Sequence, residues 1–139
     1  MTEPVSPLGP YEMEVTVEPT HIDRLGHVNN VVYLSWVQDV AVAHWFASAT
    51  EEQKAAYLWV VAKHEIEYKR PSKEGDVLVL TTWVGKANHH LFTRNTKISR
   101  KADGRVVVEA VSLWAPVDPE SKRPVKPGKD IYAMFSTDH

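Results

Sequence analysis

The chain has 139 residues, of which 43% are hydrophobic, and a formal net charge of -2. This length and apolar content suit one compact domain with its own core, and the near-neutral charge argues against a general affinity for nucleic acid. Because the sequence contains no cysteine, a disulfide framework, a thiolate nucleophile and a thiolate metal site are excluded.

The first ten residues hold three prolines and a glycine, without the apolar stretch of a signal peptide. We therefore expect a flexible lead-in over residues 1–10 and a single domain over residues 11–139. Residues 11–18 alternate between apolar side chains and glutamate or threonine, which predicts a half-buried strand ended by Pro19. No run is apolar for long enough to span a bilayer, so we expect a cytoplasmic protein that does not enter a membrane.

The next segment, residues 20–29, places polar side chains and a glycine directly before a long apolar run. Gly26 favours a turn, and Asn29 is a favourable N-cap. The pattern therefore predicts a corner that leads into a helix over residues 30–47. Helix starts present unpaired N–H groups and a partial positive charge, so the Asp23 carboxylate at this corner is a candidate for acyl chemistry.

The helix has a narrow polar edge, formed by Ser35, Gln38 and Asp39, and is otherwise almost entirely apolar. A helix of this composition is typical of one enclosed by other elements. The simplest enclosure is a sheet that curls around it.

Four further strands are predicted downstream, separated by turn signals that include Asp103-Gly104; they cover residues 57–69, 77–84, 91–100 and 105–115. Residues 50–54 form a polar connector or a short helical turn, and residues 130–135 add a turn of helix. Because the turns are short, we expect successive strands to be antiparallel neighbours. The fold class is therefore α+β, with an antiparallel sheet wrapped around one long buried helix. The outer face of such a sheet needs a cover, so we expect a homodimer or homotetramer.

The element order and the corner resemble the hotdog-fold acyl thioesterases, in particular the 4-hydroxybenzoyl-CoA thioesterase-like group. The similarity runs over roughly residues 11–127, and its most specific part is the motif Asp23-x-x-Gly26-His27-Val28-Asn29-Asn30-x-x-Tyr33-x-x-Trp36. The segment from His27 to Tyr33 is also similar to plant acyl-ACP thioesterases. This resemblance implies a hotdog fold and a hydrolase that releases CoA and a carboxylic acid from an acyl-CoA, without a cofactor.

The resemblance also implies the catalytic groups. In this family an aspartate ten residues before the motif tyrosine is catalytic, which corresponds to Asp23, acting as nucleophile or general base. The family's oxyanion donor is a backbone N–H at the helix start, which falls at Asn30. Plant-type enzymes use aspartate, asparagine and histidine at alternate positions. Here Asp23 and His27 match, whereas Leu25 replaces the asparagine, which favours the aspartate-only mechanism.

Several alternatives remain open at this point. His27 is either catalytic or structural, and another hotdog branch carries its carboxylate on the helix, near Asp39. The protein could be a non-catalytic acyl-CoA-binding module, an acyl-ACP thioesterase or a hotdog hydratase. The spacing of His21, Asp23 and His27 lacks the usual helical metal-ligand pattern, so we expect no metal site.

Substrate contacts are expected from Asn29 and Tyr33 at the helix start. CoA phosphates call for basic side chains, although each candidate is also interpretable as a solvated strand charge; the candidates are Lys63, Lys69, Arg70, Arg94 and Arg100. Four aromatic side chains are candidates for an acyl pocket, although they are also readable as core: Trp36, Trp45, Phe46 and Trp59.

Overall fold

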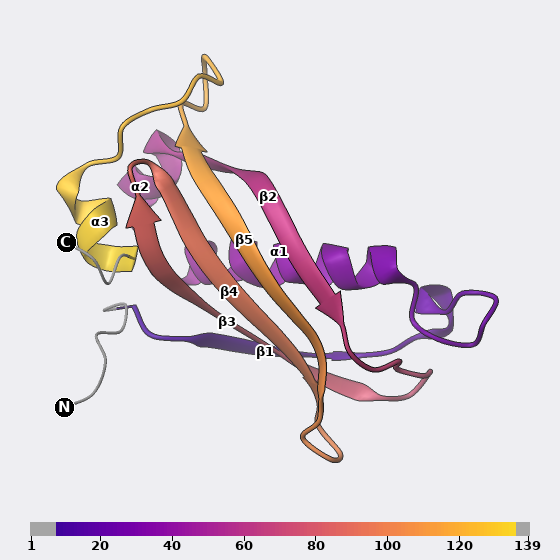
Figure 1. The fold of residues 1–139 in the computed structure, drawn as a ribbon. Helices are drawn as coiled ribbons and strands as arrows, with labels where there is room; N and C mark the ends of the chain where they lie inside the picture. The colour runs from indigo at the N-terminus through magenta and orange to yellow at the C-terminus, as the bar shows by residue number, and fades with distance from the viewer. Residues whose placement is uncertain (1–7, 136–139) are drawn as a thin grey trace.

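The computed structural model describes residues 8–135, which form one five-stranded antiparallel sheet with a long helix across it (Figure 1). Of the predicted lead-in, residues 1–7 lie outside the described part. The elements are β1 (Tyr11–Thr16), a 3-10 turn (Pro19–His21), α1 (Asn30–Ser48), α2 (Glu51–Ala56), β2 (Leu58–Tyr68), β3 (Val77–Asn88), β4 (Leu91–Arg100), β5 (Val106–Val117) and α3 (Lys129–Phe135). The predicted α+β class is confirmed.

Helix α1 begins where the sequence indicates. The side chain of Asn29 caps it by accepting a hydrogen bond from the N–H of Val31 at 3.0 Å, as expected of a good N-cap. Its buried residues recur at the three- and four-residue spacing of one helix face: Tyr33, Trp36, Val37, Val40, Ala41, His44 and Trp45. This face lies on the concave side of the sheet. Within residues 8–135, no helix combines the length and apolarity needed to cross a membrane.

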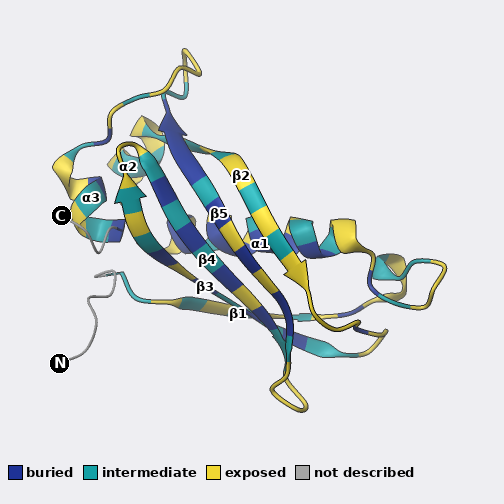
Figure 2. Cartoon of the chain, viewed as in Figure 1, coloured by how far each residue is buried: buried dark blue, intermediate teal, exposed yellow. Residues whose placement is uncertain are grey.

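The sheet follows the order β1-β3-β4-β5-β2. Alternation along each strand directs one set of side chains toward α1 and the other outward, which gives the banded burial in Figure 2. The main core packs Leu80, Ile98 and Val108 of neighbouring strands against Val37 and Val40 of α1.

The predicted neighbour relation between the second and third strands is wrong. β2 pairs with β5 at one edge of the sheet, whereas β3 pairs with β1 at the other. Residues 69–76 therefore form a crossover between edges, and its backbone is held by hydrogen bonds to Val107, Val28 and Val17. Local turn signals reveal that the chain reverses; they do not reveal which edge the next strand joins.

The prediction of a helix enclosed on nearly all sides also needs correction. The outer stripe of α1 is open, with Val31, Val42 and Phe46 exposed by 69%, 45% and 57%. Leu58 and Val60 on the neighbouring edge strand β2 are exposed as well. The sheet covers only the inner face of α1, which passes behind the strands in Figure 1.

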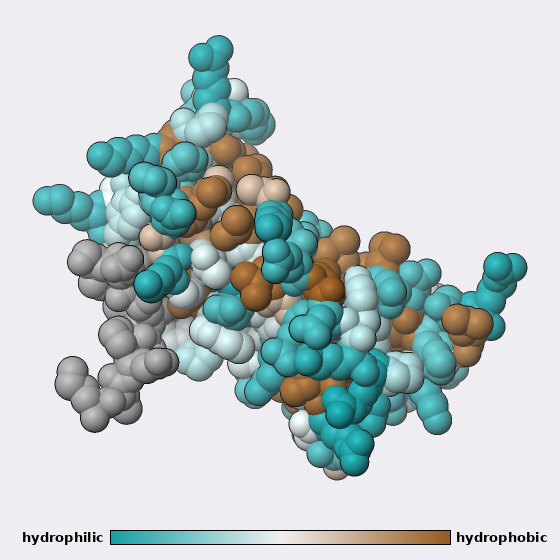
Figure 3. Space-filling model, viewed as in Figure 1, coloured by the Kyte–Doolittle hydropathy of each residue, from teal (hydrophilic) through white to brown (hydrophobic). Residues whose placement is uncertain are grey.

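The outward face of the sheet is mixed in character. Figure 3 shows this face, on which brown apolar patches interrupt a mostly polar surface. Trp83 and Val111 line a shallow hollow there, together with the charged side chains Glu65, Lys97 and Glu109. Val60 of the edge strand β2 is exposed on this side as well, because it alternates with the inward side chain of Trp59.

Candidate active site

The corner before α1 is a closed loop that fixes the backbone around Asp23. The N–H of Asp23 donates to the carbonyl of His27 at 2.9 Å, and the N–H of Gly26 donates to the carbonyl of Asp23 at 3.1 Å. Gly26 has φ +80°, a left-handed conformation that glycine adopts without a Cβ penalty. One carboxylate oxygen of Asp23 accepts a hydrogen bond from the N–H of Leu25 at 2.8 Å. The turn therefore fixes the orientation of the half-buried carboxylate.

Two long-range contacts hold this corner against the rest of the fold. The N–H of Val28 donates to the carbonyl of Ser72 in the crossover at 3.0 Å, and the N–H of Asn29 donates to the carbonyl of His21. Ile22 and Val28 form an isolated antiparallel bridge across the loop. The crossover that joins β2 to β3 therefore supports the start of α1.

At the start of α1, one backbone donor has no acceptor among the described residues. The cap takes the N–H of Val31, and the N–H groups of Val32 and Tyr33 donate to the carbonyl of Asn29. The N–H of Asn30 has no acceptor within residues 8–135. Since helix starts concentrate partial positive charge, this amide is suited to bind a developing oxyanion.

The other predicted corner residues differ in their placement. The imidazole of His27 is half-buried in the loop, and Leu25 projects into solvent with 80% of its surface exposed. The ring of His21 packs edge-on against Trp36, and its Nδ1 accepts the N–H of Glu18. Within the described residues, no group of three His, Cys, Asp or Glu side chains has metal-binding geometry.

Tyr33 lies behind the corner in the core, with 2% of its surface exposed. Burial raises the pKa of its phenol, and neighbouring Ser72 partly offsets that rise. The ring packs against Trp36 and Tyr68. In the single chain, the side chain of Tyr33 therefore packs in the core beneath the first turn of α1 and is not exposed to a ligand.

The predicted CoA contacts do not form one cluster. Lys63 and Arg70 are exposed; Lys63 pairs with Glu65 at 3.0 Å, and Arg70 donates to the carbonyl of Val106. Arg94 is different, because it lies inside the protein with only 7% of its surface exposed. It is neither a solvated strand charge nor a side chain that surface phosphates can reach.

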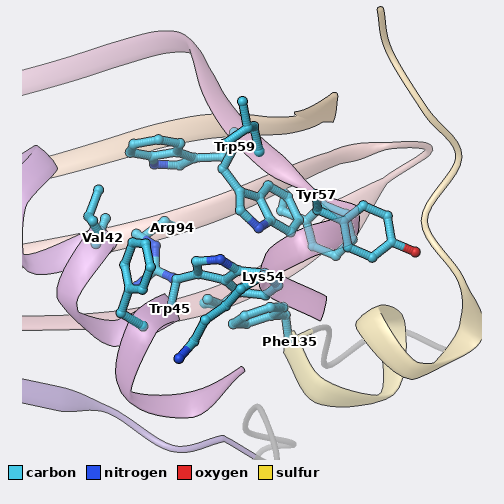
Figure 4. A pocket seen from close by; sticks show the side chains of 13 residues that line it. Val42, Trp45, Lys54, Tyr57, Trp59, Arg94 and Phe135 are labelled. Atoms are coloured by element: carbon cyan, nitrogen blue, oxygen red, sulfur yellow. The ribbon is translucent and has the colours of Figure 1, made fainter. Parts of the chain in front are cut away.

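An apolar cavity of about 260 Å³ opens at the other end of α1 (Figure 4). Its lining comes from all three α-helices and from β2, β3, β4 and β5: Ala41, Val42, Trp45, Phe46, Lys54, Tyr57, Leu58, Trp59, Val84, Phe92, Arg94, Trp114 and Phe135. Three of the four aromatic residues expected at an acyl pocket are in this lining, whereas Trp36 belongs to the main core. We call this cavity the aromatic pocket.

Arg94 sits in the aromatic pocket and is held by uncharged groups. One guanidinium nitrogen donates to Nδ1 of His44 at 3.0 Å and to the hydroxyl of Thr82 at 3.1 Å. Because arginine only donates, Nδ1 of His44 must be the unprotonated nitrogen. Burial and the Arg94 charge lower the pKa of His44 to about 4, so this histidine is neutral at physiological pH.

The sequence contains a signal for this arginine that simple composition does not use. Phe92, Arg94, Thr96 and Ile98 alternate on one face of β4 and are all buried. An arginine in phase with phenylalanine and isoleucine indicates a charge that faces the core.

The sequence did not predict the contact between His64 and Ser112, in which Nδ1 of the imidazole lies 2.6 Å from the hydroxyl. Ser112 is only 1% exposed, so it is not accessible as a nucleophile in the single chain.

The corner contains the two groups that acyl transfer to water requires at a minimum, a carboxylate and an oxyanion donor. A carboxylate can attack a carbonyl carbon or take a proton from water. A free N–H at the positive end of a helix can polarise the carbonyl and bind the oxyanion. The aromatic pocket can hold an apolar group.

The chain is similar to known proteins over most of its length. The model of the thioesterase-like superfamily matches residues 17–135. The chain is 32% identical over 78 residues to the chloroplastic acyl-[acyl-carrier-protein] hydrolase FATB3 of Cuphea viscosissima, a match that covers 56% of this chain and 19% of that protein. The chain therefore spans only about a fifth of the length of this plant relative.

Two further matches cover most of both partners. The long-chain acyl-CoA thioesterase FadM of Escherichia coli is 23% identical over 120 residues, which is 81% of this chain and 86% of that enzyme. The crystal structure of a Thermus thermophilus thioesterase complexed with coenzyme A and Zn superposes with a TM-score of 0.77 at 21% identity, covering 89% of this chain and 90% of that chain. The superposition confirms the expected hotdog fold.

Proposed function

The chain belongs to the thioesterase-like superfamily, and on that premise we propose that it hydrolyses acyl-CoA thioesters to CoA and a free carboxylic acid. The observation that carries the proposal is the corner. There the Asp23 carboxylate is held by the N–H of Leu25 in the loop that leads to α1, and α1 begins with the free N–H of Asn30. A thiolate is a good leaving group, so neither a metal nor a strong general acid is required.

In the proposed mechanism, the N–H of Asn30 donates to the thioester carbonyl oxygen and stabilises its negative charge in the transition state. Asp23 either attacks the carbonyl carbon, giving a mixed anhydride that water then cleaves, or removes a proton from the attacking water. In both routes the carbon–sulfur bond breaks and the CoA thiolate leaves. His27 is proposed to position the water. A well-placed oxyanion donor is worth roughly 3–4 kcal/mol of the barrier.

We propose that CoA lies along the protein surface, with its phosphates near Lys63 and Arg70. Both side chains are exposed and belong to β2 or to the crossover that follows it. The CoA in the Thermus thioesterase and the acyl-CoA named for FadM support this carrier. The similarity to plant acyl-carrier-protein hydrolases favours acyl-carrier protein as a second candidate.

We also propose that two copies of the chain associate through β2 and the outer stripe of α1. β2 is an edge strand with exposed Leu58 and Val60, and it lies beside the exposed apolar residues Val42 and Phe46 of the pocket mouth. Unpaired edges and contiguous apolar patches are typical of interfaces. A homodimer formed there would close the mouth of the aromatic pocket.

The test is thiol release from a panel of acyl-CoAs that differ in chain length and ring content, followed with a thiol reagent. The best acyl group is then compared on CoA and on acyl-carrier protein. Repeated turnover on CoA, with more than one thiol released per active site, is the expected result. Higher kcat/KM on the protein carrier would replace the first candidate by the second. Stoichiometric binding without thiol release would make the chain a non-catalytic acyl-binding module.

A further inference from the structure

Three of the side chains that line the aromatic pocket, Trp59, Arg94 and Trp114, can only donate hydrogen bonds, whereas the hydroxyl of Tyr57 accepts one from the N–H of Gly128. The indole Nε1 atoms of Trp59 and Trp114 are buried and have no acceptor within residues 8–135. Arg94 supplies a guanidinium, of which only one nitrogen makes a hydrogen bond to a described partner. An indole N–H and a guanidinium only donate. Because buried donors are rarely left without a partner, this excess indicates a missing acceptor.

Within residues 8–135, no acidic side chain neutralises the positive charge in the pocket. The side chains that accept from Arg94 are the neutral His44 and the hydroxyl of Thr82. None of the pocket-lining residues is acidic, and no carboxylate within the described residues lies within ion-pair distance of Arg94. Lys54 at the rim adds a second cation, although Glu51 pairs with it at 3.1 Å.

A lone cation among aromatic rings is costly to keep. Arg94 shares the pocket lining with Trp45 and Trp59 (Figure 4). Burial lowers the pKa of Arg94 to about 10, so it stays charged. Charges removed from water without a counter-charge destabilise a fold. A ligand that brings a negative charge would supply the counter-charge that Arg94 lacks among the described residues, and its oxygens would offer acceptors in a pocket where two indole N–H groups have none.

We propose that the aromatic pocket binds the far end of an acyl group that terminates in a carboxylate, with Arg94 as its counter-charge. The proposal rests on the thioesterase function for the other end of the same substrate. The remaining lining is apolar and aromatic, which suits the methylene or ring portion next to the carboxylate. The cavity of about 260 Å³ exceeds the roughly 150 Å³ that admits a benzene molecule.

Other occupants fit the pocket less well. A plain methyl terminus would leave Arg94 without a counter-charge among the described residues and both indoles without acceptors. A hydroxyl terminus brings one acceptor but no charge. The carboxylate of a second chain would neutralise Arg94 but would compete with the substrate, and the measurements below register it as the absence of any ligand effect.

The first experiment compares thioesters of matched length that end in either a carboxylate or a methyl group. We expect the wild-type protein to prefer the carboxylate by about 10- to 100-fold in kcat/KM, as for hydrogen bonds to a charged group. Arg94→Met should abolish or reverse the preference, whereas Arg94→Lys should keep part of it. Equal or better hydrolysis of the methyl-terminated thioester by the wild-type protein would overturn the proposal.

Chain length adds a second readout to this series. Ala41 in the pocket lining follows Asn30 by eleven residues, which corresponds to roughly 16 Å along α1. If the same chain supplies corner and pocket, the carboxylate preference should appear only with long acyl groups. A preference that peaks at short chains would assign the corner to the partner copy. A length series without any carboxylate preference contradicts the proposal.

A milder variant protects the test against misfolding. Trp59→Phe keeps the ring but removes one N–H donor, so it should lower the carboxylate preference by about two- to tenfold with little effect on the fold. Trp83→Phe is the matched control, because Trp83 lies on the outward face of the sheet. An unchanged preference in Trp59→Phe together with an unchanged preference in Arg94→Met would refute the assigned contacts.

Ligand binding without chemistry separates this inference from the thioesterase proposal. The monomethyl and dimethyl esters of one dicarboxylic acid are titrated against the fluorescence of the pocket tryptophans. Tighter binding of the monoester without thiol release from any thioester would support the pocket and refute the enzyme. Thiol release with equal ester affinities would do the reverse. Tighter binding of the monoester without a carboxylate preference among thioesters would mean that the pocket holds the product acid, which overturns the substrate proposal.

Discussion

The two ends of α1 are built in opposite ways. Its N-terminal end is a polar loop of consecutive residues, closed by backbone hydrogen bonds around Asp23 and left with one free amide at Asn30. Its C-terminal half faces a mostly apolar cavity, with lining residues from three helices and four strands and a buried cation at Arg94. One end is suited to chemistry on a carbonyl, and the other is suited to recognise what the carbonyl carries.

Because the two ends of α1 differ in this way, substitutions at each end should change different properties of the enzyme. Changes at the corner should alter the rate for every substrate, because all thioesters share the same reacting group. Changes in the pocket should alter the ranking of substrates, because only the acyl group reaches it.

The largest effect is expected for Asp23→Asn. Amide nitrogen and oxygen neither attack the carbonyl nor accept the proton of water effectively, so kcat should fall by about 1000-fold or more, equivalent to about 4 kcal/mol of barrier. Thiol release with the best acyl-CoA measures it, and circular dichroism and thermal melting show whether the fold is kept.

The matched control is Asp39→Asn, which removes an exposed carboxylate from α1 itself. Its turnover should stay within a few-fold of the wild type, which corresponds to less than about 1 kcal/mol in the activation barrier. If Asp39→Asn is inactive and Asp23→Asn is active, the carboxylate on the helix is the catalytic one and the corner has another role.

The next effect concerns the proposed cover of the pocket mouth. Val60→Glu places a charge on the exposed edge of β2, and burial of an unpaired charge in a dimer interface should weaken association by roughly 100-fold or more. Light scattering across a dilution series would register a shift toward the mass of one chain. Thr81→Glu on β3, between β1 and β4, is the control. Unchanged association in Val60→Glu would remove β2 from the interface.

Much of the fold was predictable because the signals are local. Strand alternation, the Asn29 cap and the glycine turn at Gly26 involve neighbours in sequence, and the predicted elements agree with the observed bounds within a few residues. The partner of β2 was not predictable, since a crossover and a hairpin turn look alike in sequence. The alternation along β4 indicates that Arg94 faces the core, whereas its place in a pocket required knowledge that α1 covers that end of β4.

The candidate site also has a part that is local in sequence and a part that is not. Asp23 and the amide of Asn30 lie within one short segment, so a motif can propose both. The pocket joins Trp45, Trp59 and Phe135, which are distant in sequence and meet only through tertiary packing. The sequence supports the expectation of an aromatic lining and of an inward-facing arginine on β4, but it does not show that they meet in one pocket.

A smaller effect is expected from pH, through His44. Burial and Arg94 lower the pKa of folded His44 to about 4 from 6.5, so below pH 6.5 the unfolded chain binds a proton that the folded chain does not. Stability should therefore be constant for this group above about pH 6.5 and fall as the pH drops toward 4. Burial also lowers the pKa of His64, which acts in the same direction.

Thermal melting between pH 7.5 and pH 4 tests this linkage. His44→Gln retains an acceptor for Arg94 but cannot titrate, so its melting temperature should depend less steeply on pH than that of the wild type. Arg94→Met should also reduce the slope, because one of the two causes of the shift is removed. Identical slopes in all three proteins would show that His44 does not carry the effect.

The smallest effects are expected at Asn29 and Asn30, where substitution distinguishes the role of a side chain from that of a backbone N–H. Asn29→Ala removes the cap of α1 and should lower the free energy of unfolding by about 1 kcal/mol, measured by urea denaturation. Asn30→Ala keeps the proposed oxyanion donor, which is the backbone N–H, so stability and turnover should change little. A large loss of turnover in Asn30→Ala would transfer the role to its side chain.

The most direct test of the division along α1 uses an uncleaved substrate. Asp23→Asn is titrated with the preferred acyl-CoA while tryptophan fluorescence reports pocket binding and a thiol reagent reports hydrolysis in the same sample. We predict saturable binding within a few-fold of the wild-type KM, equivalent to less than about 1 kcal/mol, with intact thioester recovered at the end. Thiol release at the wild-type rate would contradict the account, because the chemistry would then not depend on the corner at Asp23.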